Sequence, residues 1–433
     1  MTRNLSQPPA TLAPMTSFTA RTDRNLVRAN GRSRRHVLLT LTAPRPRRKT
    51  TQRPPVNVAF ILDRSGSMGG AKIGLAKYAV ERALQGLTPK DRFSIVTYDD
   101  QIETVVSSRT TTPKAKQDAL LRLQTVDARG STDLHGGWSA GAAQATAHLA
   151  TNGVNRCLLL TDGLANIGLT EPTALAAFAK DLRASRVTTS TFGVGADFDE
   201  TLLTAIADAG GGHFYFIGRP EHIVDAMTSE LGELLETVAR DVVVDIKHHP
   251  ALELQALSPV VNAAAIPGEQ RLLIGDLVAG QNVEMVLSVH FPQAEVGIAT
   301  TAFFTIGDRD GVLKADGCTL AWQHAEGADV DAQPRERDVD RSVARIYAAR
   351  ARLEAVHLNR LGEYRDARRA LRGVARRIAD YAGSDAELND LAANLVEEVA
   401  TFSAPMPELL RKGAHFRSAN IQRSRDPGGH AQR

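Results

Sequence analysis

The chain has 433 residues, of which 43% are hydrophobic and 23% charged, a composition typical of a packed globular protein with two or three domains. No run approaches the ~18 apolar residues of a membrane-spanning helix, and the first fifteen residues lack the apolar core of a secretory signal. Only two cysteines occur, Cys157 and Cys318, so no disulfide framework is implied. We therefore expect a cytoplasmic protein with no role at a membrane.

Positive charge is concentrated at the start of the chain. The formal net charge is only +3, yet residues 1–54 carry twelve Lys or Arg against one acidic residue, Asp23. Residues 1–16 are expected to be disordered, and residues 17–54 to form a β segment followed by a basic linker. The densest basic run, residues 44–49, is suited to contact with nucleic acid or an acidic partner. No aromatic residue interleaves it, so base stacking is unsupported and we favour a solvated linker.

Residues 55–240 alternate between strand and helix patterns, which is typical of a parallel sheet with crossover helices. The expected fold class is α/β, a doubly wound and mostly parallel sheet. Strands are predicted at 56–62, 92–98, 102–106, 156–161, 187–193 and 213–217, and helices at 70–87, 113–125, 134–150, 172–185, 199–209 and 220–237. Only three residues separate the second and third strands, so these two should form a hairpin with the third as an antiparallel edge.

The remaining chain changes character twice. Residues 241–330 hold short strand patterns with turn signals, which favour a β-sandwich, and we expect it to pair with the earlier β segment so that the α/β domain is an insertion. Residues 336–402 are predicted to be helical, as a cap on the sandwich in preference to a tetratricopeptide-like hairpin. The basic residues 412–433 are expected to be a disordered tail.

The most informative motif follows the first predicted α/β strand. Asp63-Arg64-Ser65-Gly66-Ser67 places one carboxylate and two hydroxyls on a tight loop after a buried strand, where open α/β sheets bind ligands. Downstream, Thr132 precedes a helix within Gly130-Ser131-Thr132-Asp133, and Asp162 ends another apolar strand. All of these side chains offer hard oxygen atoms, the ligand type suited to Mg²⁺ or Mn²⁺.

These three loops, in this order, resemble the von Willebrand factor type A (VWA) family and its metal-ion-dependent adhesion site (MIDAS). The matching positions are Asp63, Ser65, Ser67, Thr132 and Asp162. The resemblance implies a site for Mg²⁺, with Mn²⁺ or Ca²⁺ as alternatives, in which the two aspartates act mainly through metal-bound waters or hydrogen bonds to the ligands. Layout and motifs look like bacterial multidomain members of the family.

The resemblance also implies a function. Neutral hydroxyl ligands leave the ion underneutralised, so an Asp or Glu carboxylate of another protein completes its coordination. The expected role is therefore a metal-dependent protein–protein binding module, an adaptor or scaffold and not an enzyme. AAA+ ATPases and signalling proteins are the partner classes that the resemblance suggests.

Two rival functions remain. A metal-dependent hydrolase needs a general base near the ion, and only Asp133 or His135 is on offer; we interpret Asp133 as a helix cap and the nearby Trp138 as a core residue. A nucleic-acid-binding factor would use the basic N-terminal segment, and we regard nucleic acid as an unlikely partner. Neither a His-Glu-x-x-His nor a Gly-x-Ser-x-Gly motif is present.

Overall fold

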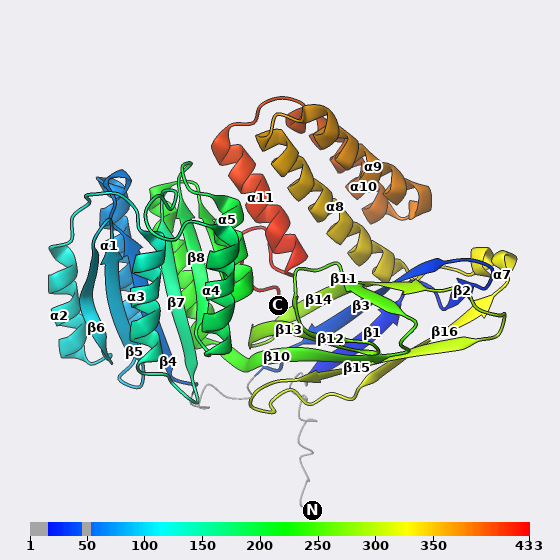
Figure 1. The fold of residues 1–433 in the computed structure, drawn as a ribbon, viewed down its shortest axis with the longest axis horizontal. Coiled ribbons are helices and arrows are strands. Elements are labelled where there is room, and N and C mark those ends of the chain that lie inside the picture. The colour runs from blue at the N-terminus through cyan, green and yellow to red at the C-terminus, as the bar shows by residue number, and fades with distance from the viewer. Residues whose placement is uncertain (1–15, 46–52) are drawn as a thin grey trace, which may run out of the picture.

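The computed structural model describes residues 16–45 and 53–433. Figure 1 shows three units, which are an α/β domain, an elongated β-sandwich beside it, and a group of helices above their junction. Residues 1–15 of the segment predicted to be disordered, and residues 46–49 of the basic run, lie outside the described residues. Among the described residues, no helix is long and apolar enough to cross a membrane.

The α/β domain contains a six-stranded sheet of order β6-β5-β4-β7-β8-β9. Neighbouring strands are parallel, except that β6 runs antiparallel to β5. This confirms the predicted fold class and the edge hairpin. The strands are β4 (Val56–Asp63), β5 (Arg92–Tyr98), β6 (Ile102–Thr110), β7 (Val154–Thr161), β8 (Thr188–Val194) and β9 (Gly211–Ile217).

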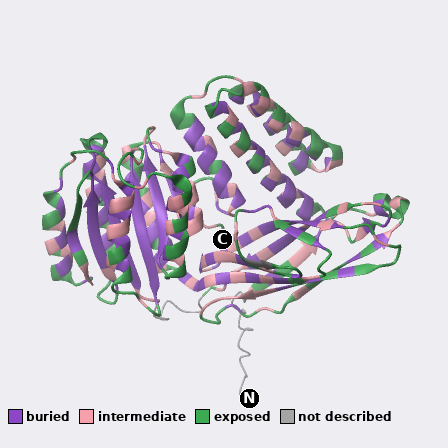
Figure 2. Cartoon of the chain, viewed as in Figure 1, coloured by how far each residue is buried: buried purple, intermediate pink, exposed green. Residues whose placement is uncertain are grey.

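Helices cover both faces of this sheet, so every residue of the central strands β4, β7 and β8 is buried (Figure 2). Asp133 and Asp199 cap α3 and α5 by accepting hydrogen bonds from backbone N–H groups of the first turn. The helices are α1 (Ala71–Gly86), α2 (Pro113–Gln124), α3 (Leu134–Thr146), α4 (Pro172–Ala184), α5 (Glu200–Gly210) and α6 (Ile223–Leu235), with short 3₁₀ turns at Gly66–Met68 and Pro220–His222.

Glycines bring α3 unusually close to the sheet. A Cβ atom on Gly137 would lie 2.3 Å from Tyr98 Cγ, and one on Gly141 would lie 2.3 Å from Ile61 Cγ1. A larger residue at either position would push the helix away. The close approach sets the start of α3, and hence the loop that carries Thr132, beside the end of β4.

The β-sandwich is built from both sides of the α/β insertion. Its sheets have the orders β1-β3-β14-β11 and β12-β13-β10-β15-β16-β2, and β3 pairs with β14 along ten residues, which confirms the predicted insertion. The strands are β1 (Ser17–Thr22), β2 (Leu26–Arg28), β3 (Ser33–Thr42), β10 (Thr237–His248), β11 (Glu253–Ala256), β12 (Val261–Ile266), β13 (Glu269–Val278), β14 (Asn282–Phe291), β15 (Ala299–Gly307) and β16 (Cys318–Ala325).

The helical region begins on the sandwich and ends on the α/β domain. Val339, Val343 and Ile346 of α8 pack in one cluster with Leu38 of β3 and Val286 of β14, as expected of a cap. The helices are α7 (Gly327–Ala332), α8 (Arg337–Arg360), α9 (Tyr364–Ala382), α10 (Ala386–Phe402) and α11 (Glu408–Gln422).

The predicted disorder of residues 412–433 is wrong. Helix α11 runs through Gln422, and the segment after it packs between the α/β domain and the sandwich. Lys412 is 1% exposed and donates to Glu200 Oε2 at 2.6 Å, and Arg425 is 3% exposed. These buried cations pair with acidic residues that are distant in sequence. The tail is therefore folded, although its sequence is polar and basic.

Candidate metal centre

The predicted metal-site loops meet at the carboxyl edge of the α/β sheet. Strand β4 ends at Asp63, and the 3₁₀ turn that follows holds Ser67. Strand β7 ends at Thr161, next to Asp162. Because β4 and β7 are adjacent parallel strands, both carboxylates emerge at the same edge.

Hydrogen bonds join four of the five predicted site residues into one group. Ser65 and Ser67 hydroxyl oxygens lie 3.1 Å apart, and the Ser67 hydroxyl donates to Asp162 Oδ1 at 2.6 Å. Asp63 Oδ1 accepts from the Ser65 backbone N–H at 2.7 Å. Thr161, which the sequence analysis missed, donates its hydroxyl hydrogen to Asp63 Oδ2 at 2.6 Å.

The fifth residue, Thr132, reaches the group from the loop before α3. A Cβ atom on Gly163 would lie 3.7 Å from Thr132 Oγ1 and 3.8 Å from Ser67 Oγ, so both hydroxyls border Gly163. The loops are tied together through their backbones, because Gly66 N–H donates to the Gly130 carbonyl at 3.1 Å. The Thr132 N–H donates to Asn166 Oδ1 at 3.0 Å, a partner that the sequence did not reveal.

The electrostatics of the group favour a cation. Asp63 and Asp162 are both fully buried, and burial raises the pKa of Asp63 to about 6, against the hydrogen bonds from Thr161 and Ser65 that lower it. The cation in contact is Lys72 of α1, whose ammonium group forms an ion pair with Asp162 and donates to the Ser67 carbonyl at 3.2 Å. Two buried carboxylates thus face one partly exposed lysine, which leaves the site with a net negative charge when both are ionised.

The donor set fits a hard divalent ion. Every side chain offered is a carboxylate or a hydroxyl, the ligands that Mg²⁺ prefers. Adjacent ligands of an octahedral Mg²⁺ lie about 3 Å apart, and the two serine hydroxyls are separated by 3.1 Å. As the family resemblance implies, Ser65, Ser67 and Thr132 are the candidate direct ligands, and Asp63 and Asp162 the candidate acceptors for metal-bound waters.

Residues next to the site have structural roles. Asp133 Oδ1 accepts from Gly136 N–H at 2.8 Å, which confirms the predicted helix cap. Trp138 is fully buried and donates to Thr189 Oγ1 at 3.2 Å, which confirms it as a core residue. The His135 ring stacks edge-on against Phe178.

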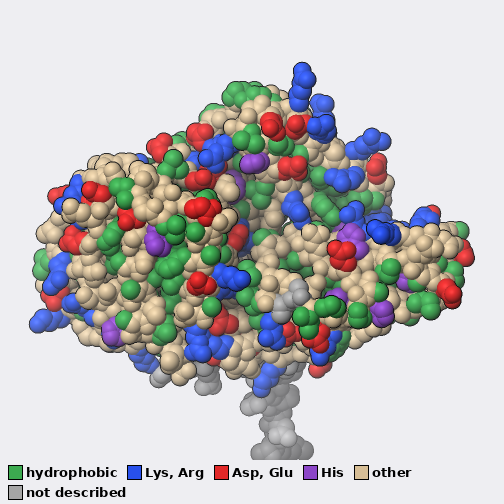
Figure 3. All heavy atoms as spheres, viewed as in Figure 1, with side chains coloured by type: hydrophobic (Ala, Val, Ile, Leu, Met, Phe, Trp, Pro, Cys, Tyr) green, Lys and Arg blue, Asp and Glu red, His purple; other side chains and the backbone are tan. Residues whose placement is uncertain are grey.

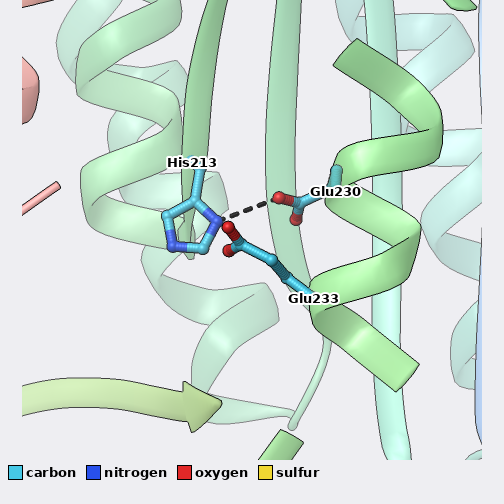
Figure 4. Close-up of side chains that lie close together, drawn as sticks. All are labelled: His213, Glu230 and Glu233. Carbon is cyan, nitrogen blue, oxygen red and sulfur yellow. Dashed lines mark hydrogen bonds and ion pairs between the residues drawn. The ribbon is translucent and has the colours of Figure 1, made fainter. Parts of the chain in front are cut away.

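A second acidic cluster lies in the same domain and is already neutralised. His213 of β9 meets Glu230 and Glu233 of α6 (Figure 4), with one ligand atom of each within 4.8 Å of the others. Glu230 accepts from Arg156, from the Ser190 and Tyr215 hydroxyls and from His213. Glu233 accepts from Arg425 at 2.6 Å and from Ala431 N–H at 2.9 Å. All four carboxylate oxygens thus have donors, and the cluster is an ion-pair network.

Comparison with known proteins agrees with this geometry. The family model described as the von Willebrand factor type A domain matches residues 57–228. Residues 57–228 are a VWA domain. The match spans β4 through most of α6, and thus includes all three loops of the candidate metal centre.

Relatives of the VWA domain occur in longer proteins. The uncharacterised protein YfbK of Escherichia coli is 34% identical over 206 residues, which are 47% of this chain and 36% of that protein. Human inter-alpha-trypsin inhibitor heavy chain H4 is 26% identical over 168 residues, 36% of this chain and 18% of that one. The chain thus matches much less than two thirds of the length of these relatives.

One solved structure shares nearly the whole architecture. The von Willebrand factor type A protein from Catenulispora acidiphila aligns with a TM-score of 0.69 at 20% identity, over 92% of both chains. At this identity the likeness shows the fold alone. The arrangement of VWA domain, sandwich and helices is therefore a recurring fold.

Proposed function

We propose that this protein is a metal-dependent protein-binding module, an adaptor or scaffold whose VWA domain captures an Asp or Glu carboxylate of a partner through a divalent ion, Mg²⁺ in the first instance. The observation that carries the proposal is the group formed by Asp63, Ser65, Ser67 and Asp162 around one point at the sheet edge. Three neutral hydroxyls leave a divalent ion with excess positive charge, and an external carboxylate neutralises it.

The surface beside the site suits a protein partner. Leu164 and Ile167, on the loop after Asp162, are 53% and 37% exposed. Apolar side chains that flank a polar anchor are typical of the contact surface of a protein interface. We infer that the partner presents its carboxylate next to apolar residues.

The hydrolase alternative is less well supported. A metal-bound water needs a nearby base to become a nucleophile. Asp133 is engaged in capping α3, and His135 packs on Phe178. The matching family model and the curated relatives do not indicate a catalytic family.

The experiment combines metal binding with partner capture. Mg²⁺ affinity is measured by calorimetry for the wild type, Asp63→Ala, Asp162→Ala and Asp197→Ala, and each protein is then used to retain partners from native lysate with Mg²⁺ or with EDTA. Asp197 is the matched control because it is an exposed carboxylate after β8, on a neighbouring loop of the same sheet.

The expected result is a protein retained by the wild type and Asp197→Ala with Mg²⁺, and lost with EDTA or with either site variant. A retained protein whose interface contains an essential Asp or Glu would complete the case. Equal retention under all conditions would refute metal-dependent capture, and Mg²⁺ affinity unchanged in Asp63→Ala would refute the metal site itself.

A further inference from the structure

The structure holds a cavity at the junction between the sandwich and the helical region, and none of its lining residues belongs to the α/β domain that carries the metal centre. It has a volume of about 260 Å³ and lies between β3, α8 and α9, room for roughly nine waters at the ~30 Å³ that each occupies in the liquid. Ligand pockets commonly occur at such domain junctions.

The lining of the cavity is largely apolar. Val343 of α8 and Val374 and Ile378 of α9 line it, and all three are buried. Several polar lining groups already have partners within the protein: the Tyr347 hydroxyl lies 3.3 Å from His36 Nε2, and the guanidinium of Arg335 lies 4.8 Å from the centre of the Tyr381 ring. The lining therefore suits contact with an apolar group better than it suits ordered water, which needs several hydrogen-bond partners.

Arginines give the cavity a positive mouth. Arg34 and Arg377 line it and are exposed to solvent, and neither forms an ion pair within residues 16–45 and 53–433. The third lining arginine, Arg335, is neutralised by Asp340, whose Oδ2 lies 2.7 Å from its Nε. Figure 3 shows Lys and Arg side chains gathered over the helical region and its border with the sandwich.

The field of these arginines reaches the interior. The pKa of His36 is lowered to about 4, first by burial and then by the charges of Arg34 and Arg335. His36 is therefore neutral at pH 7 and adds no charge of its own. An anion placed near the mouth would meet two guanidinium groups, which bind a carboxylate through paired hydrogen bonds.

We propose that this cavity binds a small amphipathic carboxylate, with its apolar body against Val374 and Ile378 and its carboxylate between Arg34 and Arg377. Charge complementarity selects the head group, and the cavity volume limits the body to about ten non-hydrogen atoms. The ligand would join β3 of the sandwich to α9, and so link two units of the molecule. This site is separate from the proposed metal centre.

The test uses the full chain and octanoate as the probe, with binding measured by calorimetry in the presence of EDTA. Octanol and protonated octylamine have the same apolar body with a neutral and a positive head group. We expect saturable one-to-one binding of octanoate, with affinity weaker by roughly fivefold to tenfold for octanol and weaker still for octylamine.

Matched variants locate the binding. Arg377→Gln and Arg34→Gln should each weaken octanoate binding by roughly fivefold to tenfold. Arg376→Gln should have no effect, because Arg376 is exposed on the same helix and has no ion pair in the described chain, but does not line the cavity. Val374→Phe, which fills the cavity, should remove the octanoate-dependent rise in melting temperature.

Three results would overturn the proposal: no saturable octanoate binding to a folded wild-type protein, octanol binding as tight as octanoate, or equal weakening by Arg376→Gln and Arg377→Gln. The last would mean that octanoate binds the general basic surface. Because EDTA is present throughout, none of these outcomes depends on the metal centre.

Discussion

Two groups of buried carboxylates lie at opposite ends of the sheet of the α/β domain. Asp63 and Asp162 lie at the carboxyl ends of β4 and β7, among hydroxyls and beside one partly exposed lysine. Glu230 lies toward the amino ends of β7, β8 and β9, where Arg156, His213 and Ser190 surround it.

The difference lies in how the negative charge is balanced. Every carboxylate oxygen of Glu230 and Glu233 accepts at least one hydrogen bond. The donors are two nearly fully buried arginines and several hydroxyl and N–H groups. Around Asp63, hydroxyl and backbone donors satisfy hydrogen bonds but bring no charge, and its pKa rises to about 6 because burial outweighs them. In the closed network, which is Glu230 and Glu233 with their donors, the loss of one partner destabilises the fold. The open group, which is Asp63, Ser65, Ser67 and Asp162, is suited to an incoming cation.

The largest expected effect comes from breaking the closed network. Glu230→Gln removes the negative charge that pairs with buried Arg156, and loss of one partner of a buried pair typically costs about 3 kcal/mol or more. We expect a loss of that size in the free energy of unfolding, measured with urea. Asp225→Asn, at an exposed site on the same helix, should change it by less than about 0.5 kcal/mol. Similar values for the two variants would show that the network contributes little.

The open group should respond in the opposite manner. Ser67→Ala removes one candidate ligand and should weaken Mg²⁺ binding about tenfold or more, while the unfolding free energy without metal stays nearly unchanged. Calorimetric titration with Mg²⁺ measures the first quantity and urea unfolding in EDTA the second. Ser107→Ala, at an exposed hydroxyl on β6, is the control. Wild-type Mg²⁺ affinity in Ser67→Ala would remove this residue from the ligand set.

The contrast between the two groups also explains what sequence could reveal. The Asp-x-Ser-x-Ser loop follows a buried strand directly, so a local pattern together with the family resemblance predicted Asp63, Ser65, Ser67 and Asp162 as candidate site residues. The adjacency of β4 and β7 places Asp162 beside the other three. The closed network joins Arg156, Glu230 and Arg425, which are far apart in sequence. No local pattern distinguishes such residues from solvated charges, which is why the basic tail was wrongly predicted to be disordered.

Lys72 was missed for a related reason, since a lysine in the first turn of an amphipathic helix usually lies in solvent. In the structure it supplies the cationic partner of Asp162, and it thus partly balances the charge of the open group.

Lys72→Met should raise Mg²⁺ affinity by about threefold at low salt, because a nearby positive charge repels the ion, and by less at high salt. Lys77→Met, farther along α1, should leave Mg²⁺ affinity unchanged. Weaker Mg²⁺ binding in Lys72→Met would instead show that Lys72 positions Asp162.

The smallest expected effect is a pH dependence specific to the closed network. Burial first, and then the charge of Arg425, lower the pKa of His213 below its ordinary value, despite the opposing effect of Glu230. Arg425 donates to His213 Nε2 at 3.0 Å, so Nδ1 carries the proton and donates to Glu230. The unfolded chain therefore gains a proton at His213 near the ordinary pKa, while the folded chain does not.

Stability from this histidine is thus present above the ordinary pKa, near 6.5, and is lost as pH falls toward the lower folded value. We expect the unfolding free energy of the wild type to fall between pH 7.5 and 5.5, and to fall less in His213→Gln. His222→Gln, at an exposed site before α6, should keep the wild-type dependence. If His213→Gln showed the full wild-type decrease, proton uptake elsewhere would be responsible, and the closed network would not sense pH in this range.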